Sequence, residues 1–147
     1  PDMLLENYEA DFANRFGLSF SETDRTENVR RLGAVAALIR QAGMIALTAV
    51  VSPYRLERER VRHMLDVGDF IEVYVNAPLE LCEKRDPKGL YRKARAGVIS
   101  DLTGVNAPYE SPTNAELILN TASTPADTLA DEVVKYLRNK RIIPAHE

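Results

Sequence analysis

Apolar residues recur along the 147-residue chain in two patterns, one typical of helices and one of buried strands. The clearest helical pattern follows Ser21, a residue type that caps helix N-termini, and stops at Gly43, a residue type common after helix C-termini. Its apolar positions are Val29, Leu32, Val35, Ala36 and Ile39. A second helical pattern starts at Thr124-Pro125 and places Leu129, Val133, Val134 and Leu137 on one face. We therefore expect a helix in each region.

Three short apolar runs predict strands, at residues 44–51, 70–75 and 116–120. The first run is rich in branched residues and predicts a strand buried on both faces of a parallel sheet. A charge-rich helix is expected at 54–66, and Pro78 opens a shorter one. Strands that alternate with helices predict an α/β fold, a parallel sheet flanked by helices. Neither a repeat nor a linker interrupts residues 1–147, so one domain is expected.

Residues 85–112 differ from the rest because they show little periodicity. Five Lys or Arg residues face one acid between Arg85 and Arg95, and glycines and prolines follow. A connection of this length and charge is typical of a lid that closes over an anionic substrate. The alternative is a basic helix end exposed to solvent.

Composition and charge exclude several classes of function. The net charge of -3 argues against a general nucleic-acid binder, and the longest apolar run is far below the roughly 18 residues of a membrane span. The single cysteine, Cys82, excludes an internal disulfide, fits a cytoplasmic location and is expected in the core. Neither His63 nor His146 has a partner near it in sequence, so no metal site is expected.

Two clusters could carry chemistry at the predicted edge of the sheet. Phe20 precedes Arg25, Asn28 and Arg31 on a helix, where a guanidinium and an amide suit an anionic oxygen and the aromatic ring suits a base. The alternative is a solvated polar face with Phe20 packed into the core. At the end of the first predicted strand, Ser52 could hold a phosphate or only cap the next helix.

The order of short motifs along the chain resembles the adenylylsulfate kinase family, from about residue 18 to the C-terminus. The motifs are Phe20-Ser21, Asp24-Arg25, Asn28-Val29-Arg30-Arg31, Ser52-Pro53-Tyr54-Arg55, Ala77-Pro78-Leu79-Glu80, Arg85-Asp86-Pro87-Lys88-Gly89-Leu90-Tyr91, Lys93-Ala94-Arg95-Ala96-Gly97 and Thr103-Gly104 with Pro108-Tyr109-Glu110. The resemblance implies a P-loop-kinase-like fold that uses Mg-ATP to phosphorylate the 3′-hydroxyl of adenosine 5′-phosphosulfate in sulfate assimilation. It also implies a cytoplasmic protein, a homo-oligomer, and either a separate enzyme or part of a bifunctional sulfate-activating protein.

The resemblance assigns roles to seven residues. Phe20 would stack on the adenine, while Arg25 and Asn28 would hold the phosphosulfate. Val51 and Ser52 would shape that pocket. Lys88 and Leu90 would belong to the lid, and a part in catalysis falls to Ser52 and Lys88. A dianion with an aromatic base needs cations and a stacking face, so these residue types suit it.

The chain departs from the family pattern where the family binds ATP. No lysine is followed by Ser or Thr, so the motif G-x-x-x-x-G-K-[ST] is not among the 147 residues, and the first strand and P-loop are expected to be absent. Ungapped counting places Tyr8 at the catalytic aspartate and Asp11 at a substrate-binding arginine. Leu102 replaces a stacking phenylalanine, and Asn106 replaces an acid.

Three functional hypotheses follow from these departures. The first is a kinase whose nucleotide-binding segment lies outside this chain. The second is an inactive regulatory or assembly domain that binds adenosine phosphosulfate or no ligand. The third is a kinase-like fold used for another anionic nucleotide. We expect no kinase activity from the 147 residues alone, and we expect weak binding of adenosine phosphosulfate.

Overall fold

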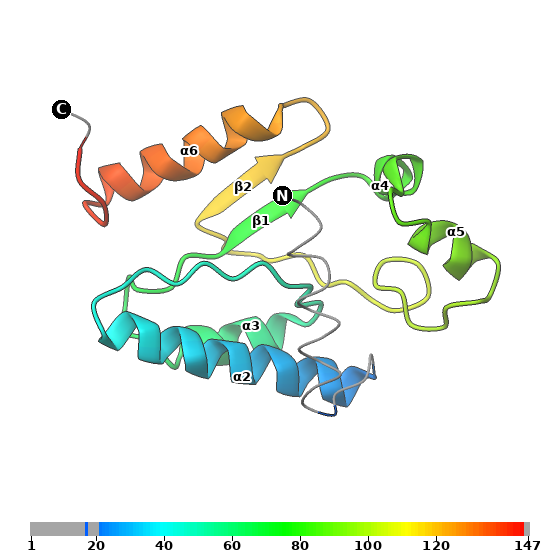
Figure 1. Cartoon of the computed structure of the whole chain (residues 1–147), viewed down its shortest axis with the longest axis horizontal. Helices are drawn as coiled ribbons and strands as arrows, with labels where there is room; N and C mark the ends of the chain where they lie inside the picture. The colour runs from blue at the N-terminus through cyan, green and yellow to red at the C-terminus, as the bar shows by residue number, and fades with distance from the viewer. Residues whose placement is uncertain (1–16, 18–20, 146–147) are drawn as a thin grey trace. The chain divides into compact units, whose positions relative to one another are not determined.

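The computed structural model describes residue 17 and residues 21–145. They form α2 (Glu22–Gln41), α3 (Arg55–Arg62), β1 (Val73–Asn76), α4 (Leu79–Arg85), α5 (Leu90–Arg95), β2 (Leu117–Asn120) and α6 (Ala126–Asn139), shown in Figure 1. The chain divides into two compact units. Unit 1 takes in the described residues up to Phe70 together with Lys93–Ser111, and unit 2 takes in Ile71–Arg92 and the described residues from Pro112 onward. The single-domain expectation stays a prediction.

The helix α2 begins and ends where its sequence predicts. The Ser21 side chain accepts a hydrogen bond from the backbone N–H of Asp24 at 3.2 Å, which satisfies one of the unpaired N–H groups of the first turn. At the other end, Gly43 has a φ of 78°, a conformation that costs glycine little, and its N–H donates to the carbonyl of Arg40. The helix therefore has defined ends that fix the direction of the following chain.

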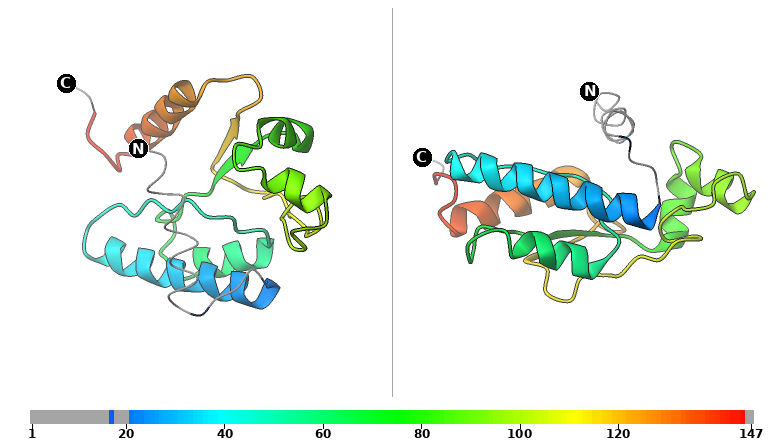
Figure 2. Two further views of the ribbon diagram at one scale, coloured as in Figure 1. Left: turned by 45° about the vertical axis from the view of Figure 1, so that its right-hand side comes forward. Right: turned by 90° about the horizontal axis from the view of Figure 1, so that it is seen from below.

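In unit 1, α3 packs against α2, and the two helices lie side by side in Figures 1 and 2. They meet where α2 has a glycine: a Cβ atom on Gly33 would lie 2.7 Å from both methyl carbons of Val61. The neighbouring Val29 is 7% exposed on the same helix. Close approach of the two backbones thus depends on the missing side chain at position 33.

In unit 2, β1 and β2 form a parallel pair, with Val73 opposite Leu117 and Asn76 opposite Asn120. At the carboxyl ends of both strands, the Asn76 side chain donates a hydrogen bond to Asn120 Oδ1 at 2.9 Å. The helix α6 packs on β2, and its Leu129 is 5% exposed. Parallel strands with helices confirm the predicted α/β class.

The predicted strand at 44–51 is wrong. Residues 44–51 are extended but form no strand, and Met44, Ile45 and Leu47 are at least half exposed. A strand exists only through the hydrogen bonds of a neighbour, and within the described residues the sheet has two strands, β1 and β2. Apolarity alone therefore predicted both the pairing and the burial of this segment wrongly.

Other boundaries moved by a few residues. The helix expected at 54–66 ends at Arg62, and the strand expected at 70–75 is β1, which begins at Val73. The stretch 85–112 is less irregular than its sequence predicts, because α5 and a short bridge between Thr103 and Ala107 lie within it. The strand expected at 116–120 is β2, which begins at Leu117, and the helix expected after Thr124-Pro125 is α6.

Candidate functional site: an arginine and an amide on α2

Arg25 and Asn28 lie three residues apart on α2, so they share a helix face, and each is partly buried. The Arg25 guanidinium donates to Thr103 Oγ1 at 3.1 Å and to the Asp101 carbonyl at 2.6 Å. These contacts tie the start of α2 to a loop far along the chain in unit 1. Arg31 does not join this pair, because it donates to Glu27 at 2.7 Å.

Asn28 carries a buried acceptor with no hydrogen-bond partner: its Oδ1 atom is inaccessible to solvent and unpaired among the described residues. A buried polar atom left unpaired costs about 1–3 kcal/mol. Half a turn of the amide about its last side-chain bond exchanges oxygen and nitrogen, which would present a donor at the same place. An amide in this position is suited to a ligand that supplies the missing partner.

Ser52 follows the extended segment and precedes α3. Its carbonyl accepts a hydrogen bond from Arg58 Nη1 at 2.7 Å, and Arg58 Nη2 donates to the Glu110 carbonyl at 2.6 Å. Capping of α3 by Ser52 is wrong, because the residue at the helix N-cap is Tyr54, whose side chain makes no capping hydrogen bond. Val51, beside Ser52, is 53% exposed.

Lys88 and Leu90 belong to unit 2, where both are exposed at the surface. The turn that carries them is held by Asp86, whose carboxylate accepts hydrogen bonds from the backbone N–H groups of Tyr91 at 3.2 Å and Arg92 at 3.0 Å. Desolvation raises the pKa of Asp86, but these N–H bonds outweigh it, so the pKa lies below its usual value. An ionised Asp86 therefore holds the start of α5.

Some residues singled out from the sequence are not among those that the structure describes. Phe20, Tyr8, Asp11 and His146 fall outside the described residues. Cys82 is half-buried rather than a core residue, and it lies beside Tyr91, whose pKa is raised by burial and then by Cys82.

No group of three or more His, Cys, Asp or Glu side chains is placed to hold a metal ion in the part of the chain that the structure describes. The described residues also contain no glycine-rich phosphate loop. Residue 17 and residues 21–145 therefore offer neither a phosphate loop nor an acidic cluster for Mg-ATP, and we derive no step through it.

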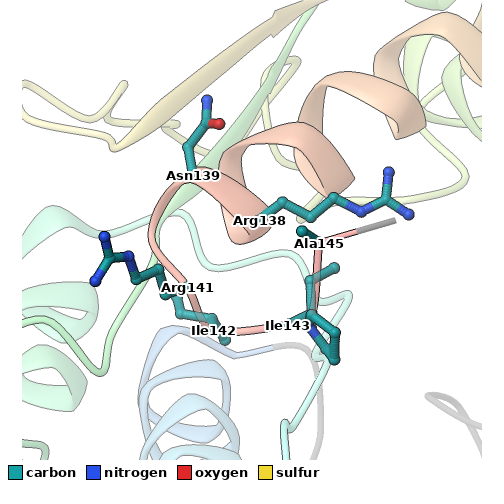
Figure 3. A pocket seen from close by; sticks show the side chains of 7 residues that line it. Arg138, Asn139, Arg141, Ile142, Ile143 and Ala145 are labelled. Atoms are coloured by element: carbon teal, nitrogen blue, oxygen red, sulfur yellow. The ribbon is translucent and has the colours of Figure 1, made fainter. Parts of the chain in front are cut away.

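A hollow of about 560 Å³ lies at the end of α6, and none of the predicted site residues line it. Figure 3 shows the guanidinium groups of Arg138 and Arg141 on opposite sides of this hollow, pointing in different directions. Charges that diverge do not form a joint anion site. The hollow consequently adds nothing to the cluster on α2.

Sequence reasoning missed the part played by Arg58, because the charge pattern at 54–66 predicts a charge-rich helix but not which of its charges is buried. Glu57 is 8% exposed and Arg58 is 7% exposed. The signal that could have found it is the spacing of Arg55, Arg58 and Arg62, which lie three and four residues apart on one helix face.

These elements define an α/β protein with parallel strands, in which an arginine and an amide share one face of α2. A model of the adenylylsulphate kinase family matches residues 11–120, and the chain belongs to this family. The resemblance read from the motifs is thereby confirmed.

Three similar proteins carry the comparison further. A probable adenylyl-sulfate kinase of Halalkalibacterium halodurans is 54% identical over 82% of this chain and 60% of its own length. The bifunctional enzyme NodQ of Azospirillum brasilense is 48% identical over 97% of this chain and 23% of its own length. The solved structure of the Mycobacterium tuberculosis APS kinase CysC in complex with AMPPNP and APS is 41% identical, covers 90% of this chain and 76% of that chain, and has a TM-score of 0.81.

The chain spans about 60% of the length of the first curated relatives that it matches. The superposition on an APS kinase confirms the P-loop-kinase-like fold class. None of the helices within residues 21–145 is both long and apolar enough to cross a membrane.

Proposed function

We propose that this chain acts in the ATP-dependent phosphorylation of the 3′-hydroxyl of adenosine 5′-phosphosulfate, and that its own residues bind this substrate. Family membership supports the substrate class. The observation that carries the proposal is the pair of Arg25 and Asn28 on one face of α2, with the buried Oδ1 atom of Asn28 unpaired among the described residues.

The chemistry of the pair fits one end of such a substrate. The Arg25 guanidinium carries a positive charge and several donors, which suit the negatively charged oxygens of a phosphosulfate. Its bonds to Thr103 and the Asp101 carbonyl orient the side chain before a ligand arrives, so less freedom is lost on binding. The Asn28 amide would gain a partner in the complex. Phe20 is the proposed stacking residue for the adenine.

Further roles are part of the same proposal. Val51 and Ser52 shape the phosphosulfate pocket, and Lys88 with Leu90 acts from the loop over 85–112. Positive charge on such a loop suits a polyanionic substrate, and its closure would exclude water. Ser52 and Lys88 are proposed to take part in catalysis. ATP and magnesium belong to the reaction, although the residues described do not hold them.

A calorimetric titration of the full 147-residue chain with adenosine phosphosulfate tests the proposal. We expect heat of binding, and a Kd raised about tenfold or more by Arg25→Ala, because a charge-assisted contact is lost. Arg30→Ala is the matched control, since Arg30 lies on the same helix, pairs with Glu27 and is 52% exposed. No heat with the wild-type chain, or the same Kd for Arg25→Ala and Arg30→Ala, would refute substrate binding.

An assay for ATP-dependent 3′-phosphorylation separates the kinase from an inactive domain that binds the same substrate. We expect no product from the 147 residues alone, since they contain no phosphate loop. Product formed at a rate above that of an Arg25→Ala control would contradict this expectation and favour a complete kinase.

We also propose that the protein self-associates, works in the cytoplasm and serves within a sulfate-activating system. Exposed apolar side chains at Met44, Ile45 and Leu47 in the extended segment support self-association, because such surface is usually covered. A bifunctional relative supports a link to a second activity.

A further inference from the structure

Arg58 is a buried charged residue that ties two segments of unit 1 together. Its side chain is 7% exposed, and its two terminal nitrogens donate to the carbonyls of Ser52 and Glu110. The guanidinium also lies over the Tyr109 ring, 5.9 Å from its centroid. A charge so enclosed is held by partners of fixed position, which a solvated surface arginine lacks.

Further hydrogen bonds join the same two segments. The Glu110 N–H donates to the Pro53 carbonyl at 2.8 Å, and the Arg55 N–H donates to the Glu110 carboxylate at 2.7 Å. Pro53 is fully buried. Residues 52–55 and 109–111 are therefore joined by backbone and side-chain hydrogen bonds. Arg58 donates a hydrogen bond to a carbonyl in each of these segments.

We infer that Arg58 is a positioning residue for substrate binding, which fixes the backbone of Ser52 without touching the substrate. The inference rests on the proposed function, in which Val51 and Ser52 shape the phosphosulfate pocket. The planar fork of arginine can bond two carbonyls in one geometry, which a lysine ammonium cannot reproduce. A pocket wall held in place before binding loses less freedom when the ligand arrives.

The same bonds also stabilise the fold, so the test must separate positioning from stability. Arg58→Met removes the fork and keeps an unbranched apolar side chain. Arg60→Met is the matched control: Arg60 lies two residues further along α3, its side chain is 57% exposed, and it pairs with Glu57. Both variants lose one positive charge from α3, but only Arg58→Met loses the bonds to the two carbonyls.

Titration of each full-chain variant with adenosine phosphosulfate is the first measurement, at a temperature where unfolding curves show every variant folded. We expect Arg58→Met to raise the Kd about tenfold and Arg60→Met to change it less than twofold. Adenosine 5′-monophosphate serves as a second ligand because it lacks the sulfate. Arg58→Met should weaken binding of adenosine phosphosulfate more than binding of the monophosphate. A general loss of structure would weaken binding of both ligands equally, and that result would overturn the positioning role.

Backbone amide exchange is the second measurement and needs no ligand. We expect the Arg55 and Glu110 amides to exchange about tenfold faster in Arg58→Met than in wild type, and to be unchanged in Arg60→Met. Should Arg58→Met fail to fold, Arg58→Lys replaces it in both measurements, because lysine keeps the charge but bonds one carbonyl at most. Unchanged Kd and exchange in the folded variant would refute the inference.

The two measurements distinguish the two proposals. If wild type binds no adenosine phosphosulfate but exchange responds to Arg58→Met, the proposed function fails and the backbone role of Arg58 stands. If wild type binds and Arg58→Met alters neither the Kd nor the exchange, the proposed function stands and positioning by Arg58 is wrong.

Discussion

The contact between α2 and α3 predicts that replacement of Gly33 by alanine lowers the free energy of unfolding. Gly33→Ala places a methyl carbon 2.7 Å from both Cγ atoms of Val61, where ordinary contact begins at 3.4 Å. Rotation of Val61 does not relieve the contact, because a β-branched side chain in a helix has one strongly preferred rotamer and a rotation would still leave one methyl facing the added carbon. The helices must therefore separate locally.

The magnitude follows from two opposing effects. Overpacking a contact costs about 1–3 kcal/mol, and alanine gains about 1 kcal/mol over glycine in a helix interior. We expect Gly33→Ala to lower the free energy of unfolding by about 1 kcal/mol net. Val61→Ala removes both obstructing methyl groups, so in that background Gly33→Ala should become neutral or stabilising, a coupling of about 1–2 kcal/mol between the two sites.

Urea unfolding of the four proteins of this double-mutant cycle measures the effect. Gly33→Ala should shift the midpoint of unfolding by about 0.5 M to lower urea with an unchanged slope. The free energy of unfolding should rise or stay level when the same change is made in the Val61→Ala chain. If Gly33→Ala instead stabilises the wild-type chain by about 1 kcal/mol, as an unobstructed helix position would, the packing of α2 on α3 described above is wrong.

Two further predictions concern charge and assembly. Hydrogen bonds from Arg30 and Arg31 lower the pKa of Glu27 from 4.5 to about 2. The contribution of Glu27 to stability is therefore complete above pH 4.5 and is lost as pH falls through about 2. Titration of the Glu27 carboxyl by NMR should show a midpoint of about 2, and a midpoint near 4.5 would contradict the ion pairs. Light scattering at micromolar concentration should give a mass above that of one chain, and Leu47→Glu in the extended apolar segment should lower that mass, whereas a monomeric wild type would contradict self-association.

The sequence predicted the elements whose signals are local. Ser21 and Gly43 set the two ends of α2 through hydrogen bonds made within one turn, so the residue types were sufficient. The same holds for Pro78 and Pro125, which begin α4 and α6. Their fixed φ and missing N–H suit the start of a helix wherever the rest of the chain lies.

Features that depend on distant partners could not be predicted in this way. The run at 44–51 has the composition of a buried strand, but pairing and burial depend on neighbours that composition does not specify. The burial of Arg58 likewise depends on Glu110, which lies 52 residues away along the chain.

In the candidate site, the three-residue spacing of Arg25 and Asn28 predicted that they share one helix face. The spacing could not indicate that Thr103 orients the arginine or that the Asn28 oxygen lacks a partner. The orientation of Arg25 arises from a contact that spans 78 residues of sequence.

Unit 1 is interrupted in sequence, and this has a consequence for how the protein is made. Residues 71–92 belong to unit 2, so Asp101 and Thr103, the partners of Arg25, and Glu110, one of the two carbonyl partners of Arg58, leave the ribosome after that insertion. On the growing chain, α2 and α3 are therefore synthesised before these partners. Closing such long loops costs entropy before any contact compensates for it. The face of α2 that carries Arg25 is thus expected to mature late, only after Thr103 has been added.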